Sequence, residues 1–345
     1  MDYKYQAVED LCNVLPWQVD CQLDYFKEGA CILHIISEIP EVMKGLDQKK
    51  IAQVMKAHRL AKKELRDYTM TNKAQWCIVA IPNPAWAKQV FPDLSKEEAM
   101  ESLWDAILKT VHVKEDNDPI QAWNEKQMAF EKHLKVMNDY QFDELHFTNS
   151  LGTDLHVGLV KQHIWAGGSE TNENGVLFNA NMPTEEIFCM PHKYRVNGIV
   201  YASLPLNYNG VLVKDFWIEF KDGKAVNFDA KEGKDALAEL INFDEGSAHL
   251  GEVALVPYDS PISQSKILFF NTLFDENASC HLALGEAYPS CIENGLNMNE
   301  EEYDQNGVNK SNTHVDFMFG TSDMKIEGIK QDEKVLVFEN GNFVF

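Results

Sequence analysis

The sequence lacks the short motifs that identify the commonest hydrolases and nucleotide-binding enzymes. No HExxH, GxSxG, GxGxxG or P-loop pattern occurs in its 345 residues, which excludes the usual zincin, serine hydrolase and nucleotide-binding fingerprints. Seven cysteines are present, but no two are spaced as CxxC, so zinc ribbons and thioredoxin-like redox sites are excluded too. Any chemistry must therefore come from residues scattered along the chain.

Basic residues and long apolar runs are also scarce. Lys and Arg number 31 against 54 Asp and Glu, a formal net charge of −23, and such a surface repels phosphate groups. We therefore expect no nucleic-acid partner and no membrane association. The N-terminus has no apolar signal-peptide core, and the scattered cysteines suit a reducing compartment. These features predict a cytoplasmic protein.

The first third of the chain alternates strand and helix patterns. Residues 31–36 and 76–81 are short apolar runs, typical of parallel strands covered on both faces. Residues 47–68 carry an amphipathic pattern that predicts a helix between them. Ser95 and Glu98 form a capping box that begins a further helix. This order predicts an α/β domain with helices packed on a parallel sheet.

A charged run at residues 114–119 ends in proline and marks the expected domain boundary. We place an α/β N-terminal domain at residues 1–117 and a second domain at residues 118–345. A long helix directly after the boundary is expected to bridge the two.

The pattern of the second domain changes to a period of two. Residues 198–206 and 211–228 are predicted strands, the latter with a hairpin turn at Asp222-Gly223. Helical patterns recur only near residues 234–241 and 276–288. The second domain is therefore expected to be α+β and largely antiparallel.

The sharpest chemical signal is the segment Thr313-His-Val-Asp-Phe-Met318. On a strand, residues two apart share a face, so His314 and Asp316 point the same way. An imidazole beside a carboxylate suits a divalent metal. A buried hydrogen-bonded His–Asp pair is the alternative interpretation.

Two further segments carry acids between apolar residues. Glu252 lies in an aliphatic run, where a carboxylate is costly unless it is paired with a cation or protonated, or unless it faces water at a sheet edge. Glu185 and Glu186 lie in a turn, where one can face solvent while the other points inward.

Residues 275–288 have the pattern of a helix start, with Asp275 or Asn277 as its N-cap. His281 and Tyr288 would then lie on one helix face, about 10 Å apart along the axis. A surface histidine and a core tyrosine are the alternative. Together with the acids above, His281 and His314 supply the kind of ligand set that a pair of hydrolytic metals requires.

Several segments resemble the aminopeptidase T / aminopeptidase S / PepS family of metallopeptidases, and the similarity covers nearly the whole chain. The segments are NMPTEEIF, HLGEVALVP, TLFDENASCHLALGEAYP and NTHVDFMFG, supported by PNPAWAKQVFP, GTDLHVGL and SPISQSKILF. Relatives in this family begin with an additional N-terminal segment, so the resemblance implies that this chain starts inside its first domain.

Carried over residue by residue, the resemblance implies five metal ligands, which are Glu186, Glu252, His281, His314 and Asp316. It also implies an active-site tyrosine at Tyr288. Two divalent metal ions per chain are expected, and an oxygen and nitrogen ligand set without thiolate allows zinc, cobalt, manganese or magnesium. We expect Glu252 to bridge the two metals.

The function that the resemblance implies is a metal-dependent aminopeptidase with broad N-terminal specificity, which acts through a metal-bridging hydroxide. Its partners would be peptides with a free N-terminus and a second copy of the chain in a homodimer. Tyr288 would donate to the developing oxyanion, and Glu185 or Glu186 would carry the proton to the leaving amine. The alternatives are another dinuclear metallohydrolase, such as an N-acyl amino acid deacylase, and an inactive, truncated homologue.

Overall fold

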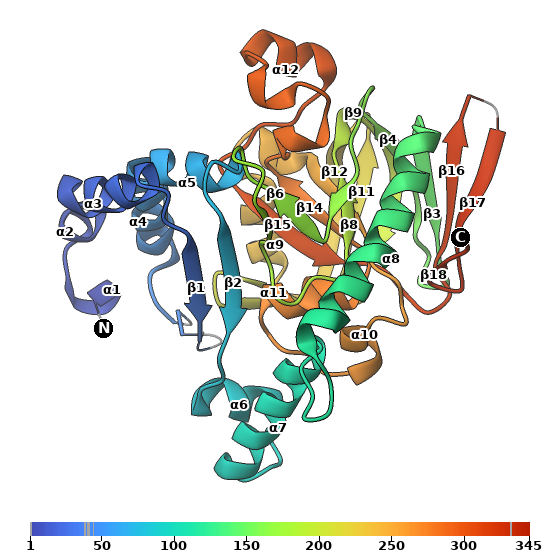
Figure 1. The fold of residues 1–345 in the computed structure, drawn as a ribbon. Helices are drawn as coiled ribbons and strands as arrows, with labels where there is room; N and C mark the ends of the chain where they lie inside the picture. Colours follow the sequence, from blue (N-terminus) through green and yellow to red (C-terminus); the bar gives the residue numbers. More distant parts are fainter. Residues whose placement is uncertain (1, 38, 40–41, 44, 332) are drawn as a thin grey trace.

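The structure is a computed structural model that describes residues 2–37, 39, 42–43, 45–331 and 333–345. The N-terminal elements lie on one side of the molecule and the C-terminal strands on the other (Figure 1). The helices are α1 (Asp2–Tyr5), α2 (Val8–Cys12), α3 (Pro16–Lys27), α4 (Gln48–Ala61), α5 (Lys63–Met70), α6 (Pro84–Val90), α7 (Lys96–Thr110), α8 (Pro119–Tyr140), α9 (Lys234–Ile241), α10 (Pro261–Ser265), α11 (Thr272–Asp275) and α12 (Glu300–Asn306).

The strands are β1 (Ile32–Ile36), β2 (Trp76–Ala80), β3 (Glu144–Thr148), β4 (Asp154–Leu159), β5 (Ala166–Gly167), β6 (Ser169–Thr171), β7 (Leu177–Asn179), β8 (Ile187–Cys189), β9 (Pro191–Tyr201), β10 (Leu206–Tyr208), β11 (Val211–Lys221), β12 (Lys224–Glu232), β13 (Leu250–Leu255), β14 (His281–Gly285), β15 (His314–Met318), β16 (Lys325–Lys330), β17 (Glu333–Glu339) and β18 (Asn342–Phe343).

Strand pairing changes along the chain from parallel to antiparallel, as the sequence periods predict. β1 and β2 form a small parallel sheet. Within the described residues, later strands form a nine-stranded sheet, ordered β10-β11-β9-β4-β3-β16-β17-β18 with β12 beside β11, and a five-stranded sheet, ordered β15-β14-β13-β8-β5. Every strand pair in these two sheets is antiparallel. A small parallel sheet followed by large antiparallel ones is therefore confirmed.

Local signals of the sequence fix several element boundaries. Ser95 Oγ accepts from the Glu98 amide at 3.2 Å, and the Glu98 carboxylate accepts from the Ser95 amide at 3.0 Å, so the expected capping box is confirmed. The hairpin turn at Asp222-Gly223 is also confirmed, with φ values of 49° and 81°. The helix expected over residues 47–68 is instead two helices, α4 and α5, which meet at Lys62.

One prediction about the small parallel sheet is wrong. The apolar run at residues 31–36 does form β1, but the strand is not covered on both faces. Leu33 and Ile35 are 59% and 58% exposed. An apolar run indicates a strand, but it does not establish which faces neighbouring elements cover.

The main hydrophobic core lies between the nine-stranded and five-stranded sheets. Phe147 and Leu155 of the first sheet and Val253, Leu282 and Phe317 of the second all belong to it, and each is at most 1% exposed. Because successive side chains on a strand point to opposite faces, the residues next to Val253, Leu282 and Phe317 project from the other face of the five-stranded sheet. That face is turned toward the N-terminal part of the chain.

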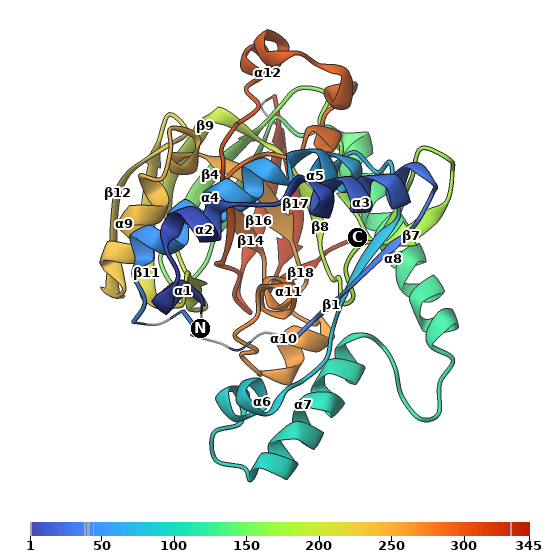
Figure 2. The same cartoon turned by 90° about the vertical axis from the view of Figure 1, so that its left-hand side faces the viewer.

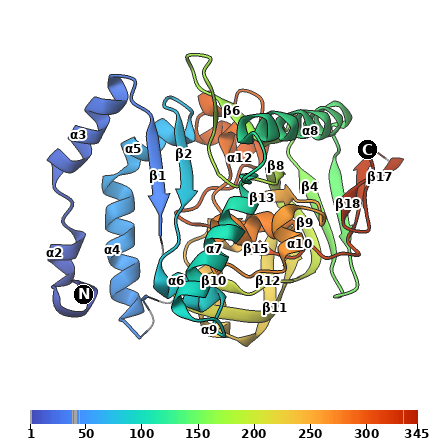
Figure 3. The ribbon, with the colours of Figure 1, turned by 60° about the horizontal axis from the view of Figure 1, so that its bottom comes forward.

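The N-terminal part packs directly on this second face. In β2, Ile78 donates its amide to the Ala180 carbonyl at 2.8 Å and accepts from the Met182 amide at 3.0 Å. Figures 2 and 3 show α4, α5 and the β1–β2 sheet lying along this side of the molecule. The segment that precedes Glu186 is therefore held by a strand of the first third.

Helices α6 and α7 share a core with the second half of the chain. Trp86 is fully buried and donates its indole N–H to the Phe269 carbonyl at 2.6 Å. Leu103 and Phe274 belong to the same hydrophobic cluster. The division into residues 1–117 and 118–345 therefore stays a prediction.

Among the described residues, no helix is long and apolar enough to cross a bilayer.

Candidate metal centre

Three neighbouring strands of the five-stranded sheet bring together four of the expected ligands. Glu252 lies on β13, His281 on β14, and His314 and Asp316 on β15. In the register of these strands, Glu252 and Asp316 flank Ala283, and His281 is opposite Ala254. Alternation places all of these side chains on the face that looks away from the core. The small alanine side chains leave room for the carboxylates and imidazoles to converge.

Glu186 joins this group from the turn before β8. His281 Nε2 lies 2.8 Å from Glu186 Oε2 and 3.8 Å from Glu252 Oε1. His314 Nε2 lies 3.2 Å from Glu252 Oε2 and 3.3 Å from Asp316 Oδ1. The two oxygens of Glu252 thus face different histidines, and the five side chains form two groups that share this carboxylate.

Backbone carbonyls orient both imidazoles. His281 Nδ1 lies 3.1 Å from the Ser279 carbonyl, and His314 Nδ1 lies 2.7 Å from the Glu286 carbonyl. Because Nδ1 of each ring can donate to these carbonyls, Nε2 is the nitrogen that faces the carboxylates and would bind a metal. Metal-binding histidines are commonly oriented in this way by the nitrogen that does not bind.

Burial and mutual repulsion dominate the electrostatics of the group. Burial raises the pKa of Glu252 above its usual value, and the Glu186 carboxylate raises it further. Burial alone would lower the pKa of His281, but Glu186, Asp316 and Glu252 outweigh it and raise this pKa to about 10. The cluster therefore attracts positive charge strongly.

A divalent metal fits these residues. Glu252 is 4% exposed and Glu186 is 7% exposed. Among the described residues, no lysine or arginine forms an ion pair with Glu186, Glu252 or Asp316, whose ionic partners are the two histidines. Glu186 Oε2 is also buried without a hydrogen bond of acceptable geometry. Since buried carboxylates need compensating charge, this donor set suits cations better than it suits hydrogen bonding alone.

The expected helix over residues 276–288 is wrong. Residues 281–285 form β14, an interior strand of the five-stranded sheet that is fully buried between β13 and β15. The sequence His-Leu-Ala-Leu-Gly favours a helix locally, but burial between two strands overrides that preference. Tyr288 follows the strand, and its hydroxyl oxygen lies 3.4 Å from His314 Nε2. His281 and Tyr288 therefore face one cavity, although not from one helix face.

The expectation that one acid of the Glu185-Glu186 turn faces solvent is also wrong. Glu185 is 6% exposed and forms an ion pair with Lys126 of α8. His112 Nε2 lies 3.4 Å from its other oxygen. Glu185 is thus neutralised from the side of α8, which makes it a poor carrier of protons for the metal centre. Its role is to fix the turn that presents Glu186.

Removing the partner of Glu185 should destabilise the fold. The Lys126 side chain is 12% exposed, and breaking a buried ion pair from one side costs about 3–5 kcal/mol. We expect Lys126→Met to lower the free energy of unfolding by that amount in urea denaturation. Lys135→Met is the control on the same helix, because the Lys135–Asp139 pair is solvent-exposed and should contribute less than about 1 kcal/mol. Equal losses in the two variants would contradict this role.

The sequence interpretation missed Glu276. This residue follows α11 and lines a cavity of about 130 Å³ together with the expected ligands and Tyr288. Burial, followed by the Asp316 and Glu186 carboxylates, raises the pKa of Glu276 well above its usual range. Its only signal in the sequence is the pair of acids at residues 275 and 276, which looks like an ordinary helix cap.

A second, larger cavity of about 530 Å³ meets the metal centre at His314 and Asp316. Its opposite wall comes from α4, with Met55 and Arg59. Arg59 is held there by an ion pair with Glu286 at 3.0 Å. The cavity thus lies between the N-terminal helices and the ligand face of the five-stranded sheet.

Comparison with known proteins agrees over the whole chain. The family described as thermophilic metalloprotease (M29) matches residues 1–343. Aminopeptidase AmpS of Bacillus subtilis (strain 168) is 46% identical over all of this chain and 84% of its own length. Aminopeptidase 2 of Geobacillus stearothermophilus is 45% identical over 92% of this chain and 77% of its own length.

A solved structure of a related protein has the same fold. Wild-type AmpT from Thermus thermophilus superposes with a TM-score of 0.92 at 38% identity, covering all of this chain and 84% of that one. The fold, the family match and the identities all agree. The chain belongs to the thermophilic metalloprotease (M29) family.

Proposed function

We propose that the chain is an aminopeptidase that uses two divalent metal ions, held by Glu186, Glu252, His281, His314 and Asp316. The observation that carries this proposal is the pair of three-residue groups, Glu186–Glu252–His281 and Glu252–His314–Asp316. They overlap at one carboxylate, whose two oxygens face different histidines. The names of the relatives, all aminopeptidases, support the same activity.

In this proposal Glu252 would be shared by the two metals. Glu186 with His281 would complete one site, and His314 with Asp316 would complete the other. Bound zinc, cobalt, manganese or magnesium would supply a water-derived nucleophile at neutral pH and polarise the scissile carbonyl. The carboxylates and the two carbonyl-oriented imidazoles hold this chemistry in one place. Their burial keeps bulk water away from the reacting bond.

Tyr288 is proposed to stabilise the negative charge that develops on the carbonyl oxygen. Burial raises the pKa of its hydroxyl well above the usual value, and the Glu252 and Asp316 carboxylates raise it further. The hydroxyl therefore keeps its proton at neutral pH and can donate a hydrogen bond. An oxyanion donor of this kind acts mainly in the transition state.

Glu186 is proposed to carry a proton to the leaving amine, in addition to binding metal. Glu276 is a further candidate for this role, because it lines the cavity that holds the ligands and burial raises the pKa of its carboxyl above the usual value. Glu185 is not proposed again, since Lys126 and His112 already engage it. Proton carriers of this type act best with a pKa near the working pH.

The larger cavity supports peptides as substrates. It extends from His314 and Asp316 to Arg59, which leaves space for residues on one side of the scissile bond. Carboxylates around the small cavity offer partners for the α-ammonium group of a free N-terminus. Within this proposal, residues 118–345 are the metal-binding domain, the protein is cytoplasmic, and two copies form a homodimer.

Blocking the substrate's N-terminus tests the proposed activity. We expect metal-loaded protein to hydrolyse short peptides and aminoacyl anilides with a free α-amino group and to leave their N-acetylated counterparts intact. Release of the first residue is followed by chromatography of the products. Equal cleavage of acetylated peptides would favour the deacylase-like alternative. Folded, metal-loaded protein that cleaves neither would contradict the proposal and support an inactive homologue.

A further inference from the structure

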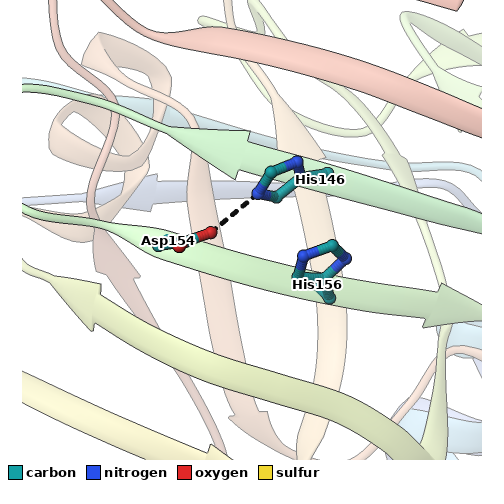
Figure 4. A group of neighbouring side chains, drawn as sticks. All are labelled: His146, Asp154 and His156. Atoms are coloured by element: carbon teal, nitrogen blue, oxygen red, sulfur yellow. Dashed lines mark hydrogen bonds and ion pairs between the residues drawn. The ribbon is translucent and has the colours of Figure 1, made fainter. Parts of the chain in front are cut away.

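A second group of potential metal ligands lies on the outer face of the nine-stranded sheet. His146 on β3 is opposite His156 on β4 in the antiparallel register, and Asp154 precedes His156 by two residues. The three side chains therefore share one face, and Figure 4 shows them converging from the two strands. Their neighbours Phe147 and Leu155 point the other way, into the core, where both are fully buried.

This group is remote from the ligands described above. Those ligands project from the face of the five-stranded sheet that looks away from the main core. His146, Asp154 and His156 project from the face of the nine-stranded sheet that looks away from the same core. Both sheets and the core between them separate the two groups, so the second group has to be explained independently of the proposed peptidase site.

The potential ligand atoms of this group lie close together. His146 Nε2 lies 2.7 Å from Asp154 Oδ1. The two imidazoles stack with centroids 4.0 Å apart and an angle of 11° between their planes. One ligand atom from each residue lies within 4.8 Å of the others. Tetrahedral ligands at about 2.0–2.2 Å from zinc lie roughly 3.4 Å from one another. Because stacked rings point their lone pairs in parallel directions, one imidazole must rotate before both can bind one ion. The side chains of His156 and Asp154 are 40% and 69% exposed, which gives them room to adjust.

A carboxylate orients the His156 ring, since His156 Nδ1 lies 2.6 Å from Glu144 Oε1. Glu327 Oε2 lies 3.7 Å from His146 Nδ1, which is an electrostatic contact beyond hydrogen-bond distance. Lys325 and Lys334 hold Glu327 at 2.7 and 3.3 Å. A proton on His156 Nδ1, donated to Glu144, would leave His156 Nε2 to bind a metal. A carboxylate–histidine pair of this kind recurs behind protein zinc ligands.

Charge at the site is compatible with a cation. The carboxylates of Asp154, Glu144 and Glu327 face the two imidazoles, and the positive groups paired with this cluster are Lys325 and Lys334. Both lysines contact Glu327, at the end of the cluster away from Asp154. The part of the cluster between His146 and Asp154 is therefore its more negative end, where a cation would bind.

We propose that His146, Asp154 and His156 bind one transition-metal ion of the zinc class, with solvent completing its coordination. Two imidazoles and one carboxylate, without thiolate, suit zinc, copper, nickel or cobalt better than calcium or magnesium. The ion would cross-link β3 and β4 and stabilise the folded state, because it binds only when the strands are paired. This assignment does not depend on the aminopeptidase proposal.

Zinc binding by matched variants tests the proposal. Wild-type protein and its His146→Gln, His156→Gln and His34→Gln variants are dialysed to equilibrium against zinc, and bound zinc is measured by elemental analysis. His34 is an exposed histidine on β1, so its variant is the control. The proposed peptidase site is the same in all four proteins, so differences in zinc content between them report the second site alone. We expect one zinc ion fewer per chain in the two cluster variants and no change in the control.

Replacement of Glu144, whose carboxylate contacts His156, gives a finer test. Glu144→Gln keeps all three ligands but removes the group that orients His156, and should weaken zinc binding at this site about 10–100-fold. Zinc-soaked wild-type crystals should show an anomalous peak between His146, Asp154 and His156. Unchanged zinc content in both cluster variants, or no peak at this position in the crystals, would overturn the proposal. Because the crystals contain wild-type protein, they test the metal site even if a variant fails to fold.

Discussion

Glu252→Gln is expected to abolish peptide hydrolysis while leaving the fold intact. Glu252 faces His281 with one oxygen and His314 with the other, so its loss should affect both metals at once. An amide has the same shape as a carboxylate, but it is a poor ligand for divalent metals. Bound metal at the peptidase site should therefore fall from about two ions per chain towards one or none.

Glu219→Gln is the matched control for this variant. Glu219 is an exposed residue of β11, so its amide variant should keep full activity and metal. Circular dichroism checks the fold of both proteins, and elemental analysis on the same samples gives the metal content. Asp316→Asn should behave like Glu252→Gln but affect one metal only. A Glu252→Gln enzyme with full metal and full rate would rule out a bridging role.

Tyr288→Phe is expected to lower kcat by roughly 10²–10³ and to retain both metals. The hydroxyl lies 3.4 Å from His314 Nε2, at the edge of the ligand group and within the cavity. Removal of a donor that acts only in the transition state lowers kcat and kcat/KM together, with KM little changed. The variant therefore separates a transition-state role from a metal-binding role.

Tyr303→Phe provides the comparison for Tyr288. Tyr303 packs in the same hydrophobic cluster as Tyr288, but its hydroxyl donates to the Gly295 carbonyl at 2.9 Å, so we expect its variant to keep the wild-type rate. Steady-state kinetics and metal content are measured on both variants. Loss of metal from Tyr288→Phe would mean that the hydroxyl helps to hold the metals.

Period-two patterning correctly predicted where some of the candidate ligands lie on their strands. The sequence alone places His314 and Asp316 on one face of a strand, and their atoms lie 3.3 Å apart. The same reasoning placed Glu252 among aliphatic residues of a strand, where it is buried. Both results depend only on the alternation of neighbouring side chains, which is a local property.

The rest of the site depends on long-range pairing that no local pattern contains. His281 occupies a segment of helical composition that becomes an interior strand because β13 and β15 flank it. Only the family resemblance indicated that His281 is a ligand. The pairing of Glu185 with Lys126 joins residues 59 positions apart. Glu276 reaches the cavity because α11 ends there, which its own sequence does not reveal.

Crystals grown with cobalt or zinc, with anomalous data collected at the absorption edge of that metal, test the central claim most directly. The proposal predicts two peaks on the ligand face of the five-stranded sheet. One should lie between Glu186, Glu252 and His281, and the other between Glu252, His314 and Asp316. No peak there, or a single peak that leaves Glu252 uncoordinated, would contradict a two-metal centre built on these five residues.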